Sequence, residues 1–206
     1  MSGFDRHWLA LREAADRRAR ADALARMLRR ALSGRDRLTL VDLGCGTGSN
    51  LRHTAPQLGG RQHWRLVDTD PVLLDAVPGS LATWAEQSGY MFRRTDHSLT
   101  VEGGSFVAEV TLEHRDLTAD PLPVANADAI TASALLDLVG HAWLERLVAA
   151  CAAHSSAALF TLSYDGRITW WPGDAMDAAV RDRVNRHQQG DKGFGPALGP
   201  HAAQAA

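Results

Sequence analysis

Residues 38–50 contain the feature that most constrains how this chain can fold: an apolar segment runs directly into three glycines at alternate positions. Residues 38–43 are predicted to form a buried strand, and Gly44, Gly46 and Gly48 follow it. Glycine lets the backbone adopt a positive φ and come close to a ligand, because no Cβ intrudes. A helix behind such a turn directs its N-terminal amides and its dipole at whatever lies there. We therefore expect a nucleotide-type cofactor site at the carboxyl end of a first strand.

The spacing of these glycines excludes two common cofactor motifs. The dinucleotide fingerprint Gly-x-Gly-x-x-Gly requires a glycine at position 49, which is Ser49. A phosphate-binding P-loop requires a lysine, and the only lysine of the chain is Lys192. The pattern that remains is Asp42-x-Gly44-x-Gly46-x-Gly48. The plainer alternative is a tight strand-to-helix turn in which the glycines have no role in ligand binding.

Length and composition indicate one globular domain. A chain of 206 residues buries a sufficient core without disulfides, and its two cysteines make neither a disulfide framework nor a metal cluster. The formal net charge of −2 provides no field for phosphate backbones, so nucleic acid is not an expected partner. The N-terminal residues have no signal-peptide core, and no apolar run has the length to span a membrane. We expect a cytoplasmic protein without a metal, and the oligomeric state stays open.

Hydrophobic periodicity divides the chain into three parts. Residues 1–37 are predicted to be an N-terminal helical cap with one helix over 5–32. Residues 38–163 alternate strands (38–43, 64–67, 106–112, 128–133, 157–163) with helices (50–57, 70–85 with a break at 78–79, 141–153), and a hairpin is inserted near 97–112. Residues 164–206 form a substrate-side C-terminal segment, with a helix from Asp174 through Val184. Strands that alternate with helices predict an α/β fold with a doubly wound, mostly parallel sheet.

With the strands placed, residues 38–163 resemble the class I S-adenosylmethionine-dependent methyltransferases, which have a Rossmann-like fold. Asp42, Gly44, Gly46 and Gly48 match the first motif, whose backbone packs against the methionine and ribose part of S-adenosylmethionine. Cys45 lies within the same turn, where packing is its plainer role. Asp68 matches the acid at the end of the second strand, beside Thr69, and the resemblance implies that its carboxylate accepts both ribose hydroxyls.

The later strand ends extend this resemblance. Asp116 and Leu117 match the position at which the family pairs an acid with the adenine amino group and lays an apolar side chain on the ring. Ser133 lies at the end of the fourth strand, and in the family this strand end passes beneath the methyl donor. The Asn/Asp-Pro-Pro-Tyr/Phe motif of amino-directed DNA and glutamine methyltransferases is missing there, which argues against nucleobase amines. Arg12 and Arg20 lie on the N-terminal helix that covers the cofactor in many relatives, and Arg12 is our first candidate to bind its carboxylate.

The C-terminal segment supplies candidates for the acceptor side, and by overall likeness it is similar to a little-characterised bacterial branch of the family. His187 is the candidate general base, because histidine is the side chain most often used for proton transfer, with a solvated loop as the alternative. The candidate substrate-binding residues are Tyr164, Trp171, Asp191 and Lys192. The family sheet ends in an antiparallel strand pair for which no sequence remains after residue 206, so we expect a truncated chain with an exposed sheet edge.

These interpretations together predict an S-adenosylmethionine-dependent methyltransferase that acts on an oxygen, nitrogen or carbon nucleophile of a small molecule. The donor is already activated, so positioning and exclusion of water are the main tasks of the protein. The arginine-rich first helix leaves an RNA methyltransferase as one alternative. A protein that binds S-adenosylmethionine without transferring its methyl group is the other alternative.

Overall fold

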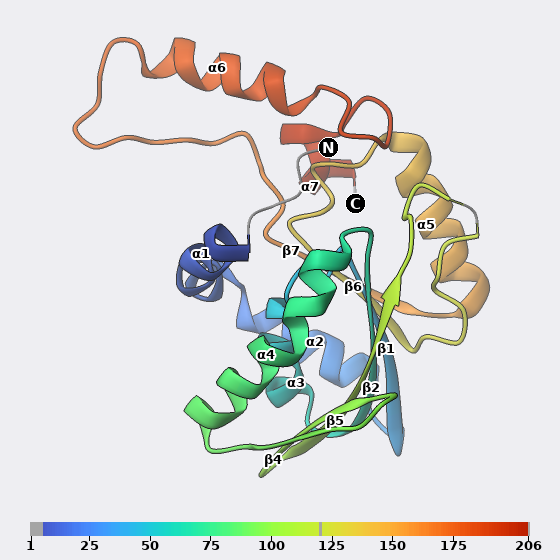
Figure 1. The fold of residues 1–206 in the computed structure, drawn as a ribbon. Coiled ribbons are helices and arrows are strands. Elements are labelled where there is room, and N and C mark those ends of the chain that lie inside the picture. The colour runs from blue at the N-terminus through green and yellow to red at the C-terminus, as the bar shows by residue number, and fades with distance from the viewer. Residues whose placement is uncertain (1–5, 120, 206) are drawn as a thin grey trace.

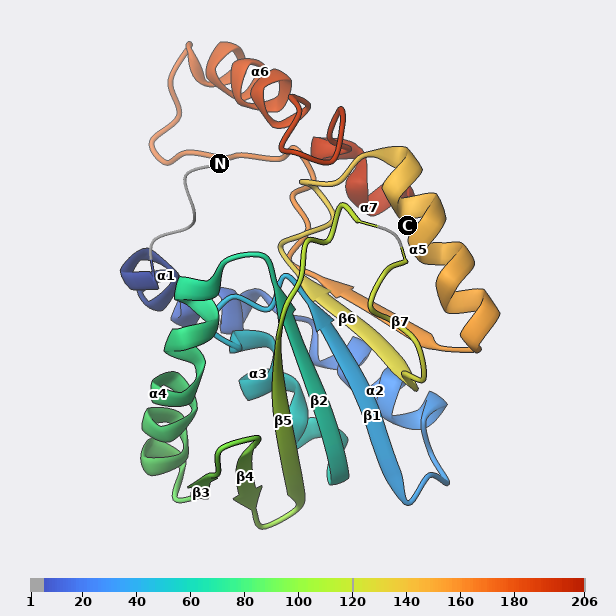
Figure 2. The same cartoon turned by 45° about the vertical axis from the view of Figure 1, so that its right-hand side comes forward.

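The computed structural model describes residues 6–119 and 121–205, and a seven-stranded sheet forms its centre (Figures 1 and 2). The strand order is β3-β4-β5-β2-β1-β6-β7, and β5, β2, β1, β6 and β7 run parallel. The strands are β1 (Arg37–Leu43), β2 (Gly60–Asp68), β3 (Met91–Arg94), β4 (Leu99–Gly103), β5 (Phe106–His114), β6 (Ala129–Ser133) and β7 (Ala157–Thr161). The doubly wound, mostly parallel α/β fold predicted from the sequence is therefore confirmed.

Two apolar cores hold helices against the two faces of this sheet. The helices are α1 (Arg6–Ala19), α2 (Asp22–Ala31), α3 (Ser49–Leu58), α4 (Pro71–Ser88), α5 (His141–His154), α6 (Asp177–Gln188) and α7 (Ala202–Ala205). The short 3-10 helix η1 (Gly199–His201) lies directly before α7. Side chains of α2, α3 and α4 share one core with Leu40, Trp64 and Leu66 of the strands. Side chains of α5 share the other core with Val41, Leu43 and Val67. The alternation of residues along β1 and β2 thus sends neighbouring side chains into opposite cores.

The predicted hairpin is confirmed, and it widens the sheet on one side. β4 pairs antiparallel with β5, and β5 then pairs parallel with β2 from Gly60 to Asp68. The sequence prediction missed β3, which pairs antiparallel with β4 at the edge of the sheet. β3 has only four residues and none is buried, so it lacks the apolar alternation that identifies a strand.

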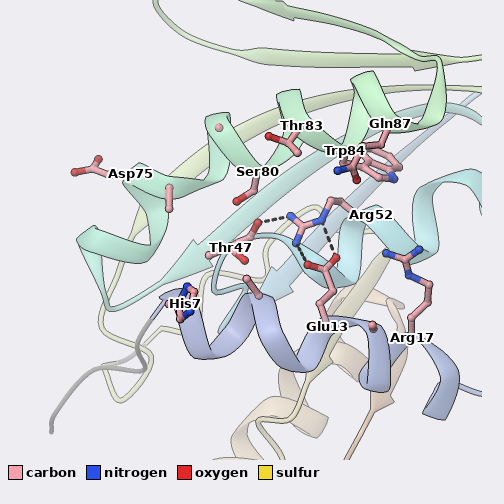
Figure 3. A pocket seen from close by; sticks show the side chains of 14 residues that line it. His7, Glu13, Arg17, Thr47, Arg52, Asp75, Ser80, Thr83, Trp84 and Gln87 are labelled. Atoms are coloured by element: carbon pink, nitrogen blue, oxygen red, sulfur yellow. Dashed lines mark hydrogen bonds and ion pairs between the residues drawn. The ribbon is translucent and has the colours of Figure 1, made fainter.

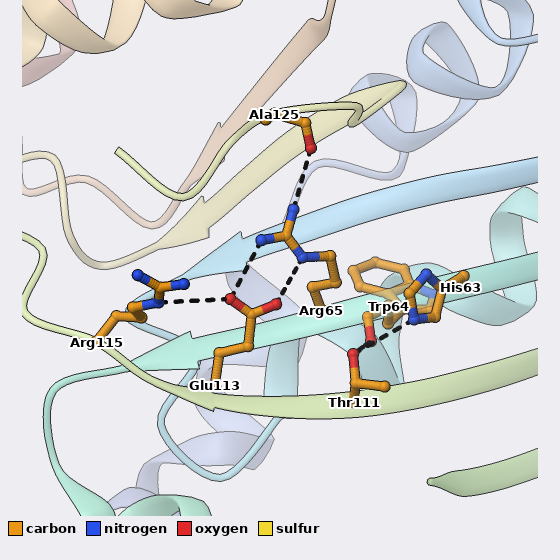
Figure 4. Close-up of polar contacts among 7 residues, drawn as sticks. All are labelled: His63, Trp64, Arg65, Thr111, Glu113, Arg115 and Ala125. Carbon is orange, nitrogen blue, oxygen red and sulfur yellow. Dashed lines mark hydrogen bonds and ion pairs between the residues drawn. The ribbon is translucent and has the colours of Figure 1, made fainter. Parts of the chain in front are cut away.

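The described residues of the connection from β5 to β6 form an irregular loop without a helix, and polar side chains occupy the sheet face beneath it (Figure 4). Arg65 of β2 donates from Nε and Nη2 to the two carboxylate oxygens of Glu113 on β5, at 2.6 and 3.1 Å. Its Nη1 also donates to the carbonyl of Ala125 in the loop, at 3.1 Å. This bidentate ion pair links two strands and fixes the loop above them.

Two helix predictions were wrong in detail. The single helix expected over 5–32 is two helices, because the chain turns at Arg20 and Ala21; residue 5 lies outside the described residues. The break expected at Pro78 does not occur, and α4 continues from Pro71 to Ser88. Leu74, Val77 and Leu81 lie on both sides of the proline and are buried in the same core, so packing outweighs the lost backbone hydrogen bond.

The C-terminal segment leaves the sheet after β7 and lies above the carboxyl ends of the strands (Figures 1 and 2). Residues 162–176 form an extended loop, and α6 has no buried residue. The predicted helix is therefore present but begins at Asp177 instead of Asp174. The chain returns through Ala197, which bridges to Gly140 before α5, and through η1 and α7. Within the described ranges, none of the helices has the length and apolarity to cross a membrane.

Candidate functional site

The glycine turn joins β1 to α3 with the backbone in the left-handed region. Gly44, Gly46 and Gly48 have φ values of 63°, 54° and 81°, which any other residue adopts only at a cost in free energy. The amide of Cys45 donates to the carbonyl of Val67 at 3.1 Å, which ties the turn to β2. The turn thus presents a side-chain-free backbone surface at the start of α3, as the sequence predicts.

Asp42 lies beneath this turn and is fully buried. Its Oδ1 accepts hydrogen bonds from Asn50 Nδ2 and Thr131 Oγ1, both at 2.7 Å. Its Oδ2 is also buried and has no hydrogen-bond partner among the described residues. Burial raises the pKa of Asp42 to about 6, although the hydrogen bonds and the nearby Arg20 guanidinium act in the opposite direction. The site therefore holds a carboxylate oxygen that is open to a hydrogen-bond donor or a cation.

Arg20, at the end of α1, inserts into the strand ends beside Asp42. Its Nη1 donates to Asn50 Oδ1 at 2.6 Å and to Thr161 Oγ1 at 2.8 Å. Its Nη2 donates to Ser133 Oγ at 2.9 Å. Arg12 was the first candidate from the sequence, where both arginines belong to one arginine-rich segment. The burial of Arg20 depends on the turn after α1, which the sequence prediction missed. Arg12 is half-buried and forms an ion pair with Asp16 at 2.9 Å.

A cavity of about 70 Å³ lies between the glycine turn, the end of β6 and α1. Six of the predicted cofactor-binding residues line it: Arg12, Asp42, Gly44, Cys45, Gly46 and Ser133. Leu9 and Arg12 of α1 form its outer wall, and Asp16, Ser49 and Asn50 complete the polar part of its lining. The structure thus brings together residues that are up to 121 positions apart in the sequence, from Arg12 to Ser133.

Asp68 adjoins the cavity and supports the turn. Its Oδ2 accepts from the amide of Gly46 at 2.7 Å, and its Oδ1 accepts from the amide of Asp70 at 2.9 Å. Burial raises the pKa of Asp68, and these amide hydrogen bonds oppose the rise. Each oxygen keeps a lone pair, so ribose binding by Asp68 stays a prediction. Thr69 is exposed, and its carbonyl lies 3.1 Å from His114 Nε2.

Asp116 and Leu117 are placed differently from what the family resemblance implies. Asp116 is exposed, and Oδ1 accepts from the amide and hydroxyl of Thr118 at 2.8 and 2.7 Å, which lowers its pKa. The Leu117 side chain is buried in the core beneath α5, where its carbonyl accepts from Trp143 Nε1 at 2.6 Å. These placements give Leu117 a packing role, so its contact with an adenine ring stays a prediction without support from this conformation.

The predicted acceptor-side residues do not line the cavity at the glycine turn. His187 is exposed on α6, and its carbonyl accepts from Lys192 Nζ at 3.2 Å. Asp191 caps its own loop through the amides of Gly193 and Gly195, and Trp171 is 96% exposed on the extended loop. Local turn chemistry accounts for the positions of the Asp191 and Lys192 side chains in this conformation, because each one bonds to backbone groups within five residues of itself.

Tyr164 lies closest to the strand ends, directly after β7. Its hydroxyl donates to Asn185 Oδ1 at 2.6 Å, which joins the loop to α6. The acceptor-side assignments of Tyr164 and the other four residues are thus not supported by shared geometry, and they stay predictions.

A larger groove of about 700 Å³ runs between α1 and α4 on the other side of the turn (Figure 3). Thr47 and Arg52 lie at its base, where Arg52 Nη1 donates to the Thr47 carbonyl at 2.6 Å. Arg52 also forms a bidentate pair with Glu13 of α1, at 3.0 and 2.7 Å. The groove therefore marks the place where α1 is attached to the helix behind the glycine turn.

Comparisons with known proteins give a likeness in fold only. No protein-family model matches the sequence, and no curated protein matches it. Similar solved structures include a methyltransferase dependent on S-adenosylmethionine from Aquifex aeolicus, with 13% identity and a TM-score of 0.48, over 84% of this chain and 79% of that one. They also include one described as such a methyltransferase from Methanococcus maripaludis, with 10% identity and a TM-score of 0.49, over 91% and 75%.

A third is the plantazolicin methyltransferase BpumL in complex with S-adenosylhomocysteine, with 13% identity and a TM-score of 0.44 over 72% of this chain. The match spans about half of BpumL, 49% of its length. All three are described as methyltransferases. At these identities the likeness concerns the arrangement of strands and helices, and the site has to be interpreted from its own residues.

Proposed function

We propose that this protein is an S-adenosylmethionine-dependent methyltransferase that acts on a small molecule. The observation that carries the proposal is Asp42, whose buried Oδ2 has no partner among the described residues and which lines a cavity together with the left-handed Gly44 and Gly46. A buried carboxylate oxygen without a partner costs free energy. A cationic group that pairs with this oxygen therefore offsets much of the cost of burying Asp42. The amino group of S-adenosylmethionine is such a cation.

The other groups around the cavity fit the remaining parts of this cofactor. The Arg12 guanidinium on the outer wall suits its carboxylate, and the backbone of Gly44 and Gly46 admits the chain of the amino acid closely. Asp68, held by the amide of Gly46, is adjacent for the ribose hydroxyls. When bound, the cofactor supplies a methyl group on a positively charged sulfur.

The size of the cavity implies that α1 moves when the cofactor binds. A cavity of about 70 Å³ accommodates the amino acid end, whereas pockets for whole ligands of this size are about 300–1,000 Å³. Leu9 and Arg12 are the side chains that close the cavity, and both belong to α1. Displacement of this helix would open the site and its return would exclude water during transfer.

Calorimetry with S-adenosylmethionine and with S-adenosylhomocysteine tests the proposal. The wild type is expected to bind both, and Asp42→Asn and Asp68→Ala are expected to weaken binding by about 10-fold or more, since each removes a charge-assisted contact. Asp75→Asn is the matched control, because Asp75 lines the α1–α4 groove instead of the cavity. If the wild type does not bind either compound, or if Asp42→Asn and Asp68→Ala bind as tightly as the wild type, the proposal is wrong.

A protein that binds the cofactor without transferring its methyl group is the second candidate. The position of His187 favours it, because the predicted general base is exposed on α6 and does not line the cavity. Tight binding without transfer of labelled methyl to fractionated small-molecule extracts would support this candidate. The arginine-rich first helix motivated the RNA methyltransferase alternative. Arg20 of that segment is buried among the strand ends and is unable to contact a phosphate backbone.

A further inference from the structure

Asp137, in the loop after β6, has a second buried carboxylate oxygen that lacks a partner. The residue is 8% exposed, and Oδ1 has no hydrogen-bond partner among the described residues. Burial raises the pKa of Asp137, and the nearby backbone N–H groups of Asp137 itself and of Tyr164 act in the opposite direction. The chain returning from α6 closes over this loop, because the amide of Gly199 donates to the Asp137 carbonyl at 3.0 Å. An orphaned buried carboxylate oxygen indicates a proton or a ligand that the protein chain does not supply.

The position of Asp137 connects it to the cavity at the glycine turn. Ser133 and Ala134, at the start of the same loop, line that cavity. Arg12 lines it from α1, and the charge of its guanidinium partly offsets the rise that burial causes in the pKa of Asp137. In the sheet order, β6 and β7 follow β1, so Asp137 and Tyr164 lie beyond Ser133 as seen from the glycine turn. If S-adenosylmethionine fills the cavity lined by Ser133 and Ala134, as the proposed function requires, an acceptor can approach it from this side.

We propose that Asp137 binds the methyl acceptor and that the acceptor is a small primary or secondary amine; this assignment rests on the proposed function. The amine binds beside Asp137 as an ammonium ion, the form that pairs with the carboxylate, and gives one N–H proton to Asp137 Oδ1. The neutral nitrogen then forms a bond with the methyl carbon, and the carbon–sulfur bond breaks with its electron pair left on sulfur. Charge balances, because one cationic sulfur, one ammonium ion and one carboxylate give a neutral thioether, a methylated ammonium ion and a carboxylic acid.

The chemistry of a buried carboxylate favours an amine over other acceptors. A carboxylate acceptor would place two like charges together in a desolvated site. An alcohol has no positive charge and is a far weaker acid than an ammonium ion, whereas an ammonium ion both pairs with the carboxylate and can give it a proton. Burial raises the pKa of Asp137, which makes its carboxylate a better proton acceptor. Arg12 and Tyr164 are the charged and titratable neighbours on the elements around it.

Matched probes of one skeleton test this assignment by binding alone. S-adenosylhomocysteine is first titrated into the wild type, Asp137→Asn, Asp137→Ser and Asp165→Asn, with melting temperatures recorded. Benzylamine, benzyl alcohol and benzoate are then titrated into each saturated protein. Asp165 is the control, since it is exposed next to Tyr164 and its contacts are a 3.0 Å hydrogen bond from the Arg167 amide and a 3.6 Å ion pair with the Arg167 side chain.

We expect benzylamine to bind the wild type and Asp165→Asn about 10-fold more tightly than it binds either Asp137 variant, because the charged pair is lost. Benzyl alcohol should not distinguish the four proteins. Equal benzylamine affinity in all four, a preference for benzoate, or no benzylamine binding up to about 10 mM overturns the assignment of Asp137. Failure of the wild type to bind S-adenosylhomocysteine overturns the proposed function itself, and the two failures are therefore distinguishable.

Discussion

Replacement of Arg20, which directly follows α1, by methionine is expected to destabilise the protein more than the same change at an exposed arginine of α1. The guanidinium donates three hydrogen bonds of 2.6–2.9 Å to Asn50, Thr161 and Ser133, and the residue is 8% exposed. Hydrogen bonds to a charged group contribute about 1.5–3 kcal/mol each. Burial lowers the pKa of Arg20, which shows that desolvation of the cation opposes these contributions. Loss of one partner of a buried ionic network costs about 3–5 kcal/mol, and we expect a loss near the lower end.

Urea unfolding of the wild type, Arg20→Met and Arg18→Met at pH 7 measures this loss. Arg18 is exposed on the same helix and controls for the change in charge and helix propensity. For a domain of this size, about 3 kcal/mol corresponds to a fall in Tm of roughly 6–12 °C. Because Arg20 lowers the pKa of Asp42, its removal is expected to raise that pKa further above about 6. A loss below about 1 kcal/mol, equal to that of Arg18→Met, would refute the reasoning that the network stabilises the fold.

Three further predictions concern the cavity and the loop above it. The pKa of Asp42 is raised from 3.8 to about 6, so ionisation of Asp42 opposes folding by about 3 kcal/mol above pH 6. Below about pH 4 the group is protonated in both the folded and the unfolded state, and this cost disappears. The stability of the wild type in urea should therefore fall, relative to that of Asp42→Asn, as the pH rises through this window. Gly46→Ala is expected to lose about 1–2 kcal/mol of stability, because its φ of 54° is unfavourable for alanine, and to weaken S-adenosylhomocysteine binding in calorimetry; unchanged binding would argue against close approach of a ligand at this residue. Trp171→Ser should change Tm by less than about 1–2 °C, since the side chain is 96% exposed, and a larger fall would show that the indole packs against the protein.

The sequence identified the elements whose signals are local. The strand before the glycine turn, the Asp70 cap of α4 and the β4–β5 hairpin all depend on neighbouring residues, and each is present in the structure. β3 was missed because an exposed edge strand has no apolar alternation. The continuous course of α4 through Pro78 was missed because burial of residues on both sides of the proline is a tertiary effect.

The candidate site divides in the same way. Asp42, the three glycines and Asp68 were found because the family motif places them at fixed spacings along two strands. Arg20 and Asp137 owe their positions to contacts between distant segments, from α1 to Thr161 and from the β6 loop to Tyr164. The polar residues around His187 in the sequence predicted a general base. The position of its side chain, however, depends on the path of α6 away from the sheet, which local sequence does not determine.

The attachment of α1 has a mechanical consequence. The helix is anchored at one end by Arg20 and near its middle by the Glu13–Arg52 pair, while Leu9 and Arg12 lie towards the other end. At 1.5 Å per residue, Leu9 is roughly 16 Å from Arg20 along the axis. A rotation of only about 10° around Arg20 as a pivot would therefore swing Leu9 by roughly 3 Å, while Glu13 would travel about 2 Å. The helix behaves as a lever, so a small angular change at its anchored end becomes a ligand-sized displacement at the wall of the cavity.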